Sequence, residues 1–320
     1  EDFKRGKGTT KKEDIKEAYI KSILESITLN KNLNISIDCG NGAAGVVAKD
    51  VYERLGCNVI ELYGELDGSF PNHHPDPSKL ENMEDLIKSV KENKCSVGLA
   101  FDGDADRLGV ISPTGEMIFP DRQMIMFSRQ VIQSSPNAKI VFDVKCSKLL
   151  SDEIVKLKGK PLICKTGHTF IKQKIRETDA LLGGEMSGHI FFNDRWLGFD
   201  DGIYAGARML EIIANSEQDD PFVTVPNMLS TPEINIPAAD EEKFHIVKTF
   251  IENSNFSDAK IVNIDGIRVE FEKGWGLLRP SNTSPCLVMR FEAETIDDLN
   301  KIKELFYIGL KSIKLNINKF

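Results

Sequence analysis

The sequence lacks paired cysteines, a long apolar run and an excess of positive charge, and each absence excludes a class of protein. Its six cysteines include no C-x-x-C pair and stand mostly in or beside apolar runs, which favours reduced core thiols over disulfides or zinc ligands. No stretch approaches the roughly 18 to 20 apolar residues of a membrane span, and no signal peptide is present. The net charge of -8 argues against nucleic acid as a general partner. We therefore expect a cytoplasmic protein that binds neither membrane nor nucleic acid.

The remaining composition is ordinary for a globular protein, with 41% hydrophobic and 28% charged residues. A length of 320 residues allows two or three domains and an ample buried core. An anionic small substrate is compatible with the negative net charge if local Arg, Lys and backbone N–H groups contact it.

The first third of the chain alternates helix and strand signals. Apolar residues with helical spacing predict a helix over residues 11–29, and alternation predicts a strand over 33–39. Ser78 has the position of a helix N-cap, and a strand over 97–101 follows that helix. This β-α-β order predicts a mostly parallel sheet with ligands beyond the carboxyl ends of its strands.

The middle third repeats this alternation. A helix that starts at Pro120 precedes strands over 139–143, 161–164 and 180–182, and polar residues follow each strand. Residues 216–232, rich in acids and prolines, are typical of a linker.

The last third has a different pattern, with a helix over 239–253, several antiparallel strands and a long final helix from Ile296. The predicted fold class is α/β, with two tandem α/β domains that have mostly parallel mixed sheets, and a C-terminal α+β domain with an antiparallel sheet. The predicted domains are residues 1–117, 118–225 and 226–320.

The strongest chemical signal is the acidic stretch Asp102-Gly103-Asp104-Ala105-Asp106-Arg107, which lies between two apolar runs. Three carboxylates at alternate positions raise one another's pKa unless a cation compensates their charge. A strand-to-loop turn that projects them toward one point makes a cage for a hard divalent cation. Arg107 could then contact an anionic group that the cation polarises.

Three other interpretations explain this stretch less well. An EF-hand loop needs Gly at position 6 and Glu at position 12, where this sequence has Arg107 and Pro113. An aspartyl-phosphate enzyme could use Asp102 as its nucleophile but leaves Asp106 unexplained. A solvated acidic turn is common, yet three aspartates and an arginine between two apolar strands favour a metal site.

Two further motifs allow a functional or a structural interpretation. Gly40–Gly45 matches G-x-G-x-x-G between a strand and a helix, and Glu61 could imitate the ribose-binding acid of a nicotinamide-dependent dehydrogenase. The alternative is a tight crossover whose glycines permit close packing. His73, His74 and Asp76 could ligate a metal, but the interleaved prolines favour a rigid surface connection.

A polar loop between two C-terminal strands suits a phosphate. Residues 279–285, R-P-S-N-T-S-P, offer a guanidinium, hydroxyls and an amide, with two prolines that would hold the loop rigid. A plain turn of Ser, Thr, Asn and Pro is the alternative.

Taken in order, D-G-D-A-D-R, K-T-G-H, G-E-M-S-G-H and R-P-S-N-T-S-P form a specific set. Their order resembles the α-D-phosphohexomutase family, in particular its bacterial phosphomannomutase/phosphoglucomutase branch, and the resemblance extends from Phe3 to the last helix. Members of this family move phosphate between positions 1 and 6 of a hexose through a bisphosphorylated intermediate, using Mg²⁺ and a phosphoserine of their first domain. The resemblance implies the same activity here, with mannose or glucose phosphates as partners and Mg²⁺ as cofactor.

The resemblance also implies a role for each motif residue. Asp102, Asp104 and Asp106 would hold Mg²⁺, with the phosphoserine oxygen as a further ligand. The residues expected to bind the sugar are Glu185, Ser187 and His189, and those expected to hold the non-reacting phosphate are Arg279, Ser281, Asn282 and Thr283.

By the same resemblance, Arg107 would contact the transferring phosphoryl group, and Lys145 and His168 match basic residues near the reacting hydroxyl. Phosphoryl transfer needs charge neutralisation and in-line positioning more than covalent help, and the set supplies both. A histidine has a reference pKa of about 6.5, which suits His168 to proton transfer, although a structural role at a helix start is the alternative. The dehydrogenase interpretation explains none of the last three motifs.

One part of the family pattern is missing from these residues. The phosphoserine loop, usually a T-A-S-H-N-P-like string, appears nowhere, and the first residue is Glu1 instead of Met. We expect the chain to correspond to domains two to four of a longer protein, and its 320 residues alone to lack mutase turnover. The alternatives are a non-catalytic phosphosugar-binding module and a phosphoglucosamine mutase, although that branch typically has Gln where Met186 stands.

Overall fold

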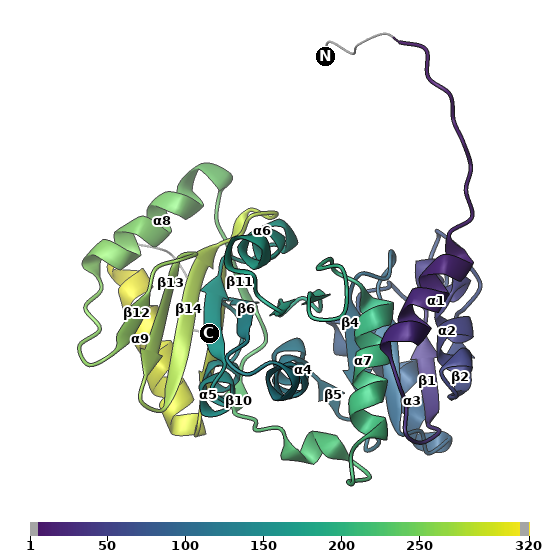
Figure 1. Ribbon diagram of the computed structural model, residues 1–320. Coiled ribbons are helices and arrows are strands. Elements are labelled where there is room, and N and C mark those ends of the chain that lie inside the picture. The colour runs from purple at the N-terminus through teal and green to yellow at the C-terminus, as the bar shows by residue number, and fades with distance from the viewer. Residues whose placement is uncertain (1–5, 314–319) are drawn as a thin grey trace.

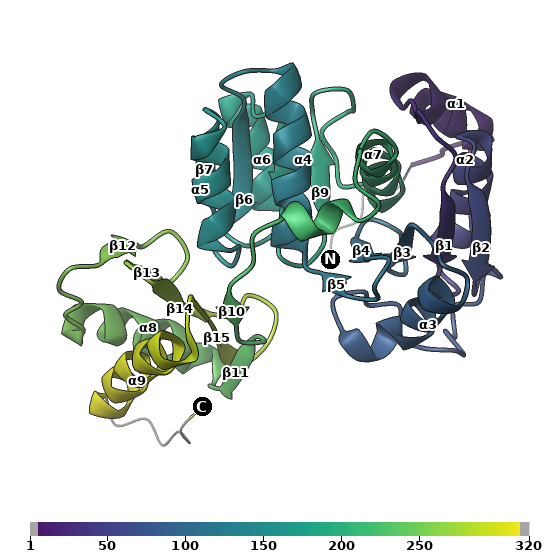
Figure 2. The same ribbon diagram turned by 90° about the horizontal axis from the view of Figure 1, so that it is seen from below.

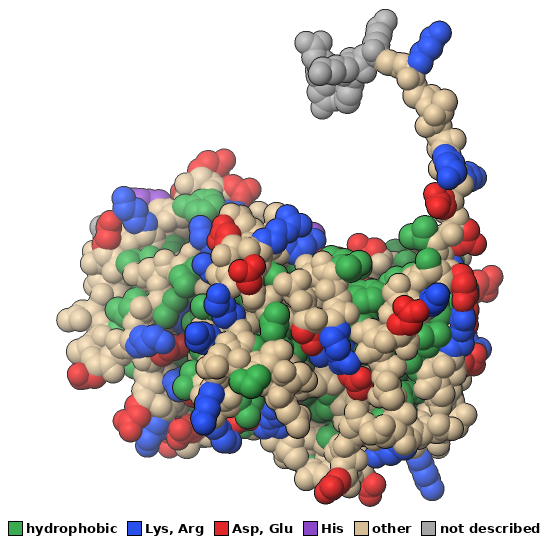
Figure 3. Space-filling model, viewed as in Figure 1, with side chains coloured by type: hydrophobic (Ala, Val, Ile, Leu, Met, Phe, Trp, Pro, Cys, Tyr) green, Lys and Arg blue, Asp and Glu red, His purple; other side chains and the backbone are tan. Residues whose placement is uncertain are grey.

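The computed structural model describes residues 6–313 and 320, so Phe3 lies outside the described residues. It contains three β-sheets with their helices, arranged as three lobes (Figures 1 and 2). The predicted fold class is confirmed, because the first two sheets are mixed and the third is antiparallel. Figure 3 shows positive and negative side chains interspersed over one face of the molecule. Within the described ranges, no helix has the length and apolar character to cross a membrane.

The first sheet is built from β1 (Asn34–Asp38), β2 (Asn58–Leu62), β3 (Val97–Phe101), β4 (Leu108–Ile111) and β5 (Met117–Ile118). Their order is β2-β1-β3-β4-β5. The strand β1 pairs in parallel with its two neighbours β2 and β3, whereas β4 and β5 continue the sheet antiparallel from β3. β3 is buried along its whole length, as expected for a strand covered on both faces.

The helical segments of the first lobe are α1 (Lys16–Ser26), η1 (Ala43–Val46), α2 (Ala48–Arg54), η2 (Leu80–Met83) and α3 (Glu84–Glu92). Two sequence predictions were wrong here. The first helix spans Lys16–Ser26 instead of residues 11–29, and Ile15, one of the apolar residues within the predicted range, is 70% exposed. Ser78 does not cap a helix, because its hydroxyl donates to Asp76 Oδ1 at 2.6 Å and the α-helix begins only at Glu84.

The second sheet repeats the arrangement of the first. Its strands are β6 (Lys139–Asp143), β7 (Lys160–Cys164), β8 (Leu182–Gly184) and β9 (Ile190–Phe192), in the order β7-β6-β8-β9. Again one strand, here β6, has two parallel neighbours, and the sheet continues antiparallel from β8 to β9. The helices that accompany it are α4 (Pro120–Ser134), α5 (Lys148–Lys156), α6 (His168–Thr178) and α7 (Gly202–Ala214).

The third sheet is formed by β10 (Leu229–Ser230), β11 (Ile234–Pro237), β12 (Lys260–Val262), β13 (Ile267–Phe271), β14 (Gly274–Pro280) and β15 (Cys286–Ala293). The helices α8 (Asp240–Asn253) and α9 (Ile296–Ser312) lie on one face (Figure 2). β14 is buried at every residue, because its other face docks on the second lobe. The predicted linker is partly anchored: it contains the short turn η3 (Pro221–Thr224), in which Phe222 is 1% exposed.

Helix α7 joins the first two lobes into one core. It lies beside the first sheet in both views (Figures 1 and 2), although it follows the second sheet in the chain. Gly206 packs against Leu99 and Tyr52, and the Tyr52 hydroxyl donates to the Ile203 carbonyl at 2.9 Å. Buried side chains of both lobes form one continuous hydrophobic cluster. The carboxyl ends of β3 and β8 are therefore held in a fixed relation.

The third lobe docks on the second through a buried arginine. Arg268, 1% exposed, donates to the carbonyls of Val144 and Cys146 at 2.7 and 2.6 Å. Its guanidinium lies 3.9 Å from the Trp275 ring centroid and 2.9 Å from Glu270 Oε1. Burial of a guanidinium is unfavourable unless its N–H groups have hydrogen-bond acceptors. This contact therefore forms only when the two lobes dock in one particular arrangement.

We expect Arg268→Met to lower the free energy of unfolding by about 3–5 kcal/mol, because Glu270 would lose its buried partner and the carbonyls of the second lobe that Arg268 contacts would lose their donor. The matched control is Lys260→Met, since Lys260 pairs with the same carboxylate at 3.0 Å but is 70% exposed. Exposed pairs contribute at most about 1 kcal/mol. Equilibrium urea unfolding followed by circular dichroism measures both, and equal losses in the two variants would contradict the argument from burial.

Candidate active site

The acidic loop after β3 turns so that three carboxylates face one region. Asp102 follows the strand directly, and its Oδ1 accepts a hydrogen bond from the backbone N–H of Arg107 at 3.0 Å. Ala105 has a φ of 64°, a left-handed conformation that reverses the chain between Asp104 and Asp106. One oxygen from each aspartate lies within 4.8 Å of the other two.

This group fits a hard divalent cation. The buried Oδ1 of Asp106 has only long ion-pair contacts among the described residues, with His189 Nε2 at 3.3 Å and Arg107 Nε at 3.9 Å, so a bound ion could replace these partners. Burial raises the pKa of Asp102 to about 7, against the opposing backbone N–H of Arg107, and the charge of Asp106 contributes to the rise. A bound dication would keep Asp102 ionised. Three carboxylates are oxygen donors of the kind that Mg²⁺ prefers.

The acidic loop is hydrogen-bonded directly to the G-E-M-S-G-H loop of the second lobe. The Leu108 N–H donates to the Gly188 carbonyl at 3.1 Å. The Gly202 N–H donates to the Ala105 carbonyl at 3.0 Å. Gly202 approaches so closely that an added Cβ would lie 2.6 Å from the Arg107 carbonyl oxygen. This close backbone packing fixes the position of the acidic loop relative to the G-E-M-S-G-H loop.

His189 stands between two carboxylates. Its Nε2 is 3.3 Å from Asp106 Oδ1, and its Nδ1 is 3.3 Å from Glu185 Oε2 and 2.8 Å from the Ser187 hydroxyl. Burial alone lowers the pKa of His189, but hydrogen bonds to Asp106 and Glu185 outweigh it and raise that pKa to about 9. Arg107 Nε lies 3.3 Å from both His189 Nε2 and Asp102 Oδ2, so this side chain joins the two loops.

The K-T-G-H turn contacts the other side of Glu185. Gly167 has a φ of 134° that favours glycine, and its N–H donates to Glu185 Oε1 at 2.5 Å. His168 begins α6, and its Nδ1 lies 3.0 Å from Asp200 Oδ2. The other oxygen of Asp200 accepts a hydrogen bond from Lys172 at 2.9 Å. His168 is therefore oriented by a carboxylate that is itself held.

Lys145 is buried and paired in the loop after β6. Its Nζ donates to Glu233 Oε1 at 2.7 Å. Burial lowers the pKa of Lys145, but the charges of Asp143 and Glu233 outweigh it and raise that pKa, which keeps the lysine charged. Asp143, the last residue of β6, also accepts the Thr166 hydroxyl at 3.1 Å and the Met186 N–H at 3.3 Å. One buried carboxylate thus holds three neighbouring loops.

Arg279 carries an unpaired buried donor. It is 4% exposed, its Nε donates to Asp265 Oδ2 at 2.9 Å, and its Nη2 has no partner within the described ranges. A buried N–H without an acceptor costs about 1–3 kcal/mol, and an anion would satisfy it.

The loop after Arg279 is closed by its own serine. The Ser281 hydroxyl accepts the N–H groups of Thr283 and Ser284 at 3.3 and 3.1 Å. The Asn282 side chain donates to the Thr166 carbonyl at 3.4 Å. The structure therefore places the R-P-S-N-T-S-P loop in contact with the K-T-G-H turn, which contacts Glu185 in turn.

Sequence reasoning missed four carboxylates that hold the site residues, namely Asp143, Asp200, Glu233 and Asp265. A role for Asp143 at the site could have been predicted, because Asp143 ends an apolar strand and α/β folds bind ligands beyond the carboxyl ends of their strands. Glu233 and Asp265 lie in irregular segments, and no spacing in the sequence connects them with Lys145 or Arg279.

The Gly40–Gly45 motif supports the acidic loop. The Ala43 N–H donates to the Gly103 carbonyl at 2.9 Å, and a Cβ on Gly42 would lie 2.7 Å from that oxygen. This close approach favours the packing interpretation of the glycines. The His73 side chain, considered above as a metal ligand, already has a partner within the protein, since its Nε2 lies 3.0 Å from Oδ2 of the buried Asp38.

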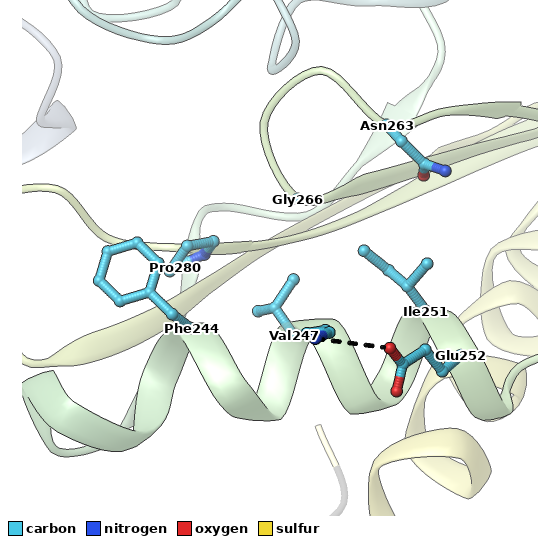
Figure 4. Close-up of a pocket in the computed structure, with 8 residues that line it drawn as sticks. Phe244, Val247, Ile251, Glu252, Asn263, Gly266 and Pro280 are labelled. Carbon is cyan, nitrogen blue, oxygen red and sulfur yellow. Dashed lines mark ion pairs between the residues drawn. The ribbon is translucent and has the colours of Figure 1, made fainter.

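A surface pocket of about 380 Å³ lies in the third lobe. Figure 4 shows Phe244, Val247 and Ile251 of α8 facing Pro280, with an ion pair between Lys248 and Glu252. Of the R-P-S-N-T-S-P loop only Pro280 lines it, and its walls are largely apolar. The side chains predicted to bind metal, sugar or phosphate are not among its lining residues.

We expect Gly202→Ala to lower the free energy of unfolding by about 1–3 kcal/mol, because its methyl group would push against the Arg107 and Ala105 carbonyls. Gly68→Ala is the control, since nothing lies within 4 Å of a Cβ there, and its effect should stay within about 0.5 kcal/mol. Thermal or urea unfolding measures both. If Gly202→Ala has the same free energy of unfolding as the parent protein, the two backbones have room for a methyl group and the close contact is contradicted.

The whole chain is similar to known proteins. Residues 17–115, 119–223 and 233–308 match sequence models described as phosphoglucomutase/phosphomannomutase alpha/beta/alpha domain II, alpha/beta/alpha domain III and C-terminal domain. A phosphomannomutase/phosphoglucomutase of Pseudomonas syringae pv. tomato is 50% identical over 96% of this chain and 66% of its own length. A phosphoglucomutase of Neisseria gonorrhoeae is 46% identical over 95% of this chain and 67% of its own length.

Solved structures agree. A phosphoglucomutase/phosphomannomutase family protein from Burkholderia thailandensis superimposes with a TM-score of 0.95 at 43% identity, covering 99% of this chain and 69% of that one. The chain thus spans about two thirds of the length of these relatives. The chain belongs to the phosphoglucomutase/phosphomannomutase family, within which it contains the regions of domains II, III and IV.

Proposed function

We propose that the chain carries the metal-, sugar- and phosphate-binding parts of a phosphohexomutase that interconverts hexose 1-phosphate and hexose 6-phosphate. The names of its relatives support this activity class. The observation that carries the proposal is that the four motif loops form one unbroken chain of contacts. The acidic loop touches the G-E-M-S-G-H loop, which touches the K-T-G-H turn, which touches the phosphate loop.

Asp102, Asp104 and Asp106 are proposed to hold Mg²⁺, which would neutralise charge on a phosphoryl group in transfer. Arg107 would contact the same phosphoryl oxygens. Its side chain is 36% exposed and its ion pair with Asp102 is long, at 3.3 Å, so it can turn toward an incoming anion. Carboxylates and guanidinium together provide a place for a phosphate between opposite charges.

Lys145 and His168 are proposed to serve the reacting hydroxyl. Lys145 is held in its charged form and can donate a hydrogen bond to a substrate oxygen. His168 is half-exposed, and Asp200 occupies its Nδ1, which leaves Nε2 for exchange of a proton with the substrate.

The sugar and its second phosphate are proposed to bind between the remaining loops. Glu185 would accept ring hydroxyls, with Ser187 and His189 beside it. The unpaired Nη2 of Arg279 would bind the non-reacting phosphate, joined by Ser281, Asn282 and Thr283. We also propose domain bounds of 1–117, 118–225 and 226–320 for these parts.

The phosphoryl donor is not among these residues. The sequence contains no T-A-S-H-N-P-like serine loop, so we propose that the 320 residues by themselves bind sugar phosphate without turnover. The longer relatives have a further third of chain that this sequence does not cover.

Arg279→Gln is expected to weaken binding of glucose 1-phosphate about 10- to 100-fold, because a hydrogen bond to a charged group contributes about 1.5–3 kcal/mol. Isothermal titration calorimetry on the 320 residues measures this affinity. The control is Arg129→Gln, whose guanidinium pairs with Glu153 away from the four motif loops. If both variants bind as the parent does, the phosphate is held elsewhere.

Turnover is expected only when a serine loop is present. The protein encoded by the complete reading frame and the 320-residue chain are assayed side by side with glucose 1-phosphate and catalytic glucose 1,6-bisphosphate. Activity of the longer protein that is lost in its Asp104→Asn variant would support the mutase. Turnover by the 320 residues alone would overturn the proposed donor, and a longer protein that binds sugar phosphate but never turns over would favour a binding module.

A further inference from the structure

An acidic side chain lies where an anion is proposed to bind. Asp265 stands just before β13, and its Oδ2 accepts the Nε–H of Arg279 at 2.9 Å. The exposed fractions of the Asp265 and Arg279 side chains are only 10% and 5%. A carboxylate so close repels a phosphate, so its charge alone makes Asp265 unfavourable for phosphate binding. We propose that Asp265 is a positioning residue for the phosphate site, which orients the Arg279 guanidinium and ties it to the K-T-G-H turn of the second lobe.

The hydrogen-bond donors of Arg279 are divided between Asp265 and a ligand. Asp265 takes the Nε–H, whereas the buried Nη2 has no partner among the described residues. A guanidinium is planar, so an acceptor that fixes Nε also fixes the direction of the other N–H groups. Asp265 therefore directs the unpaired Nη2 without occupying it, and a phosphate that binds Nη2 leaves the pair with Asp265 intact.

The backbone around Asp265 leaves this carboxylate little freedom. Gly266 has a φ of 74°, a left-handed conformation that favours glycine. A Cβ at Gly266 would lie 2.2 Å from the Leu278 carbonyl oxygen and 2.7 Å from the Cα of Arg279. The turn that carries Asp265 thus packs directly against the backbone of Arg279, and the carboxylate is a rigid partner for the guanidinium.

The same oxygen of Asp265 also accepts a donor from the second lobe. The Thr166 N–H lies 3.2 Å from Asp265 Oδ2. The Thr166 carbonyl accepts the Asn282 side chain at 3.4 Å, and the Thr166 hydroxyl donates to Asp143 at 3.1 Å. The third lobe therefore holds both backbone groups of Thr166. His168 follows two residues later, so the residue that positions the phosphate-binding arginine also holds the turn that carries His168.

Repulsion between two cations makes this positioning necessary. Burial and the charge of Arg279 both act to lower the pKa of Lys145, against the charges of Asp143 and Glu233 that raise it. Arg279 and Lys145 are therefore close enough for their charges to interact. Without Asp265, the guanidinium would lose the carboxylate that offsets this repulsion, and an incoming phosphate would have to order it. Ordering a long side chain on binding lowers the affinity.

This inference rests on the proposed function, because it assumes that the phosphate binds Arg279. Calorimetric titration of Arg279→Gln tests that assumption by itself. If Arg279→Gln binds glucose 1-phosphate as the parent chain does, the proposed phosphate site is wrong and the role of Asp265 is overturned with it. If Arg279→Gln binds weakly but a folded Asp265→Ala protein binds as the parent does, only the role of Asp265 is overturned.

The experiment is calorimetric titration of the 320-residue chain and its variants with glucose 1-phosphate. Asp265→Ala is expected to weaken binding about 2- to 10-fold, which is the cost of ordering one long side chain on binding. Asp265→Asn removes the same charge but keeps an oxygen that can accept both N–H groups, so it should bind more tightly than Asp265→Ala. The proposal is overturned if Asp265→Ala binds as tightly as Asp265→Asn, because Asp265 would then act through its charge alone.

A double-mutant cycle separates positioning from a general structural role. If Asp265 acts through Arg279, adding Asp265→Ala to Arg279→Gln should change the affinity by less than about twofold, because no arginine remains to be positioned. Equal losses in the parent and in the Arg279→Gln background would contradict the proposal.

The control is Glu272→Ala, which removes a carboxylate from the exposed turn at the other end of the β13–β14 hairpin. It should bind as the parent does, and a loss equal to that of Asp265→Ala would count against the proposal. Circular dichroism and the unfolding temperature verify the fold of each variant. If Asp265→Ala does not fold, Asp265→Glu replaces it, because Asp265→Glu keeps the charge and displaces the carboxylate by a methylene group. Weaker binding by Asp265→Glu supports positioning, and unchanged binding overturns it.

Discussion

The concentration of negative charge between the first two lobes is the constraint on which the candidate site depends. Asp102 and Asp106 each have an oxygen within 4.8 Å of the other, and Glu185 lies across His189 from Asp106; all three are wholly or partly buried, so water screens their charges weakly. In the described chain His189 and Arg107 offset this charge from both lobes. The fold therefore balances its carboxylates with cationic side chains, which is the arrangement that the proposed binding of a metal ion and a phosphate would change.

The lobes supply rigidity in different ways. The first and second share α7 and one hydrophobic cluster, which gives a dry, non-directional contact. The third is joined to the second by Arg268 and Arg290, which donate to carbonyls around Lys145. Polar contacts demand a particular register, so the loop that carries Lys145 is positioned by the lobe that carries Arg279. The loop proposed to bind phosphate and the lysine proposed to act at the reacting hydroxyl are thereby connected through buried hydrogen bonds.

Local patterns predicted most of the fold and the motif loops, because a buried strand and the loop after it are contiguous in sequence. The strand over 139–143 was predicted residue for residue, and the three-part fold class was confirmed. The predicted start of the first helix was wrong, because the side chain just before the helix is exposed to solvent. The predicted N-cap at Ser78 was wrong, because a local hydrogen bond engages its hydroxyl. The partners Glu233 and Asp265 could not be predicted, since their role exists only after the third lobe has docked.

The two repeated sheets explain why the carboxylates occupy the places they do. The strands with two parallel neighbours, β1 and β6, each end in a buried aspartate, Asp38 and Asp143, which are 1% and 0% exposed. Burial raises the pKa of both, and both are stabilised by hydrogen bonds from the loops of neighbouring strands. The site carboxylates instead follow the adjacent strands β3 and β8. Asp38 and Asp143 are therefore engaged by loops of their own lobes, whereas Asp106, in the loop after β3, contacts His189 of the other lobe. Position within the same topology thus distinguishes aspartates that tie the loops of one lobe from one that contacts the next lobe.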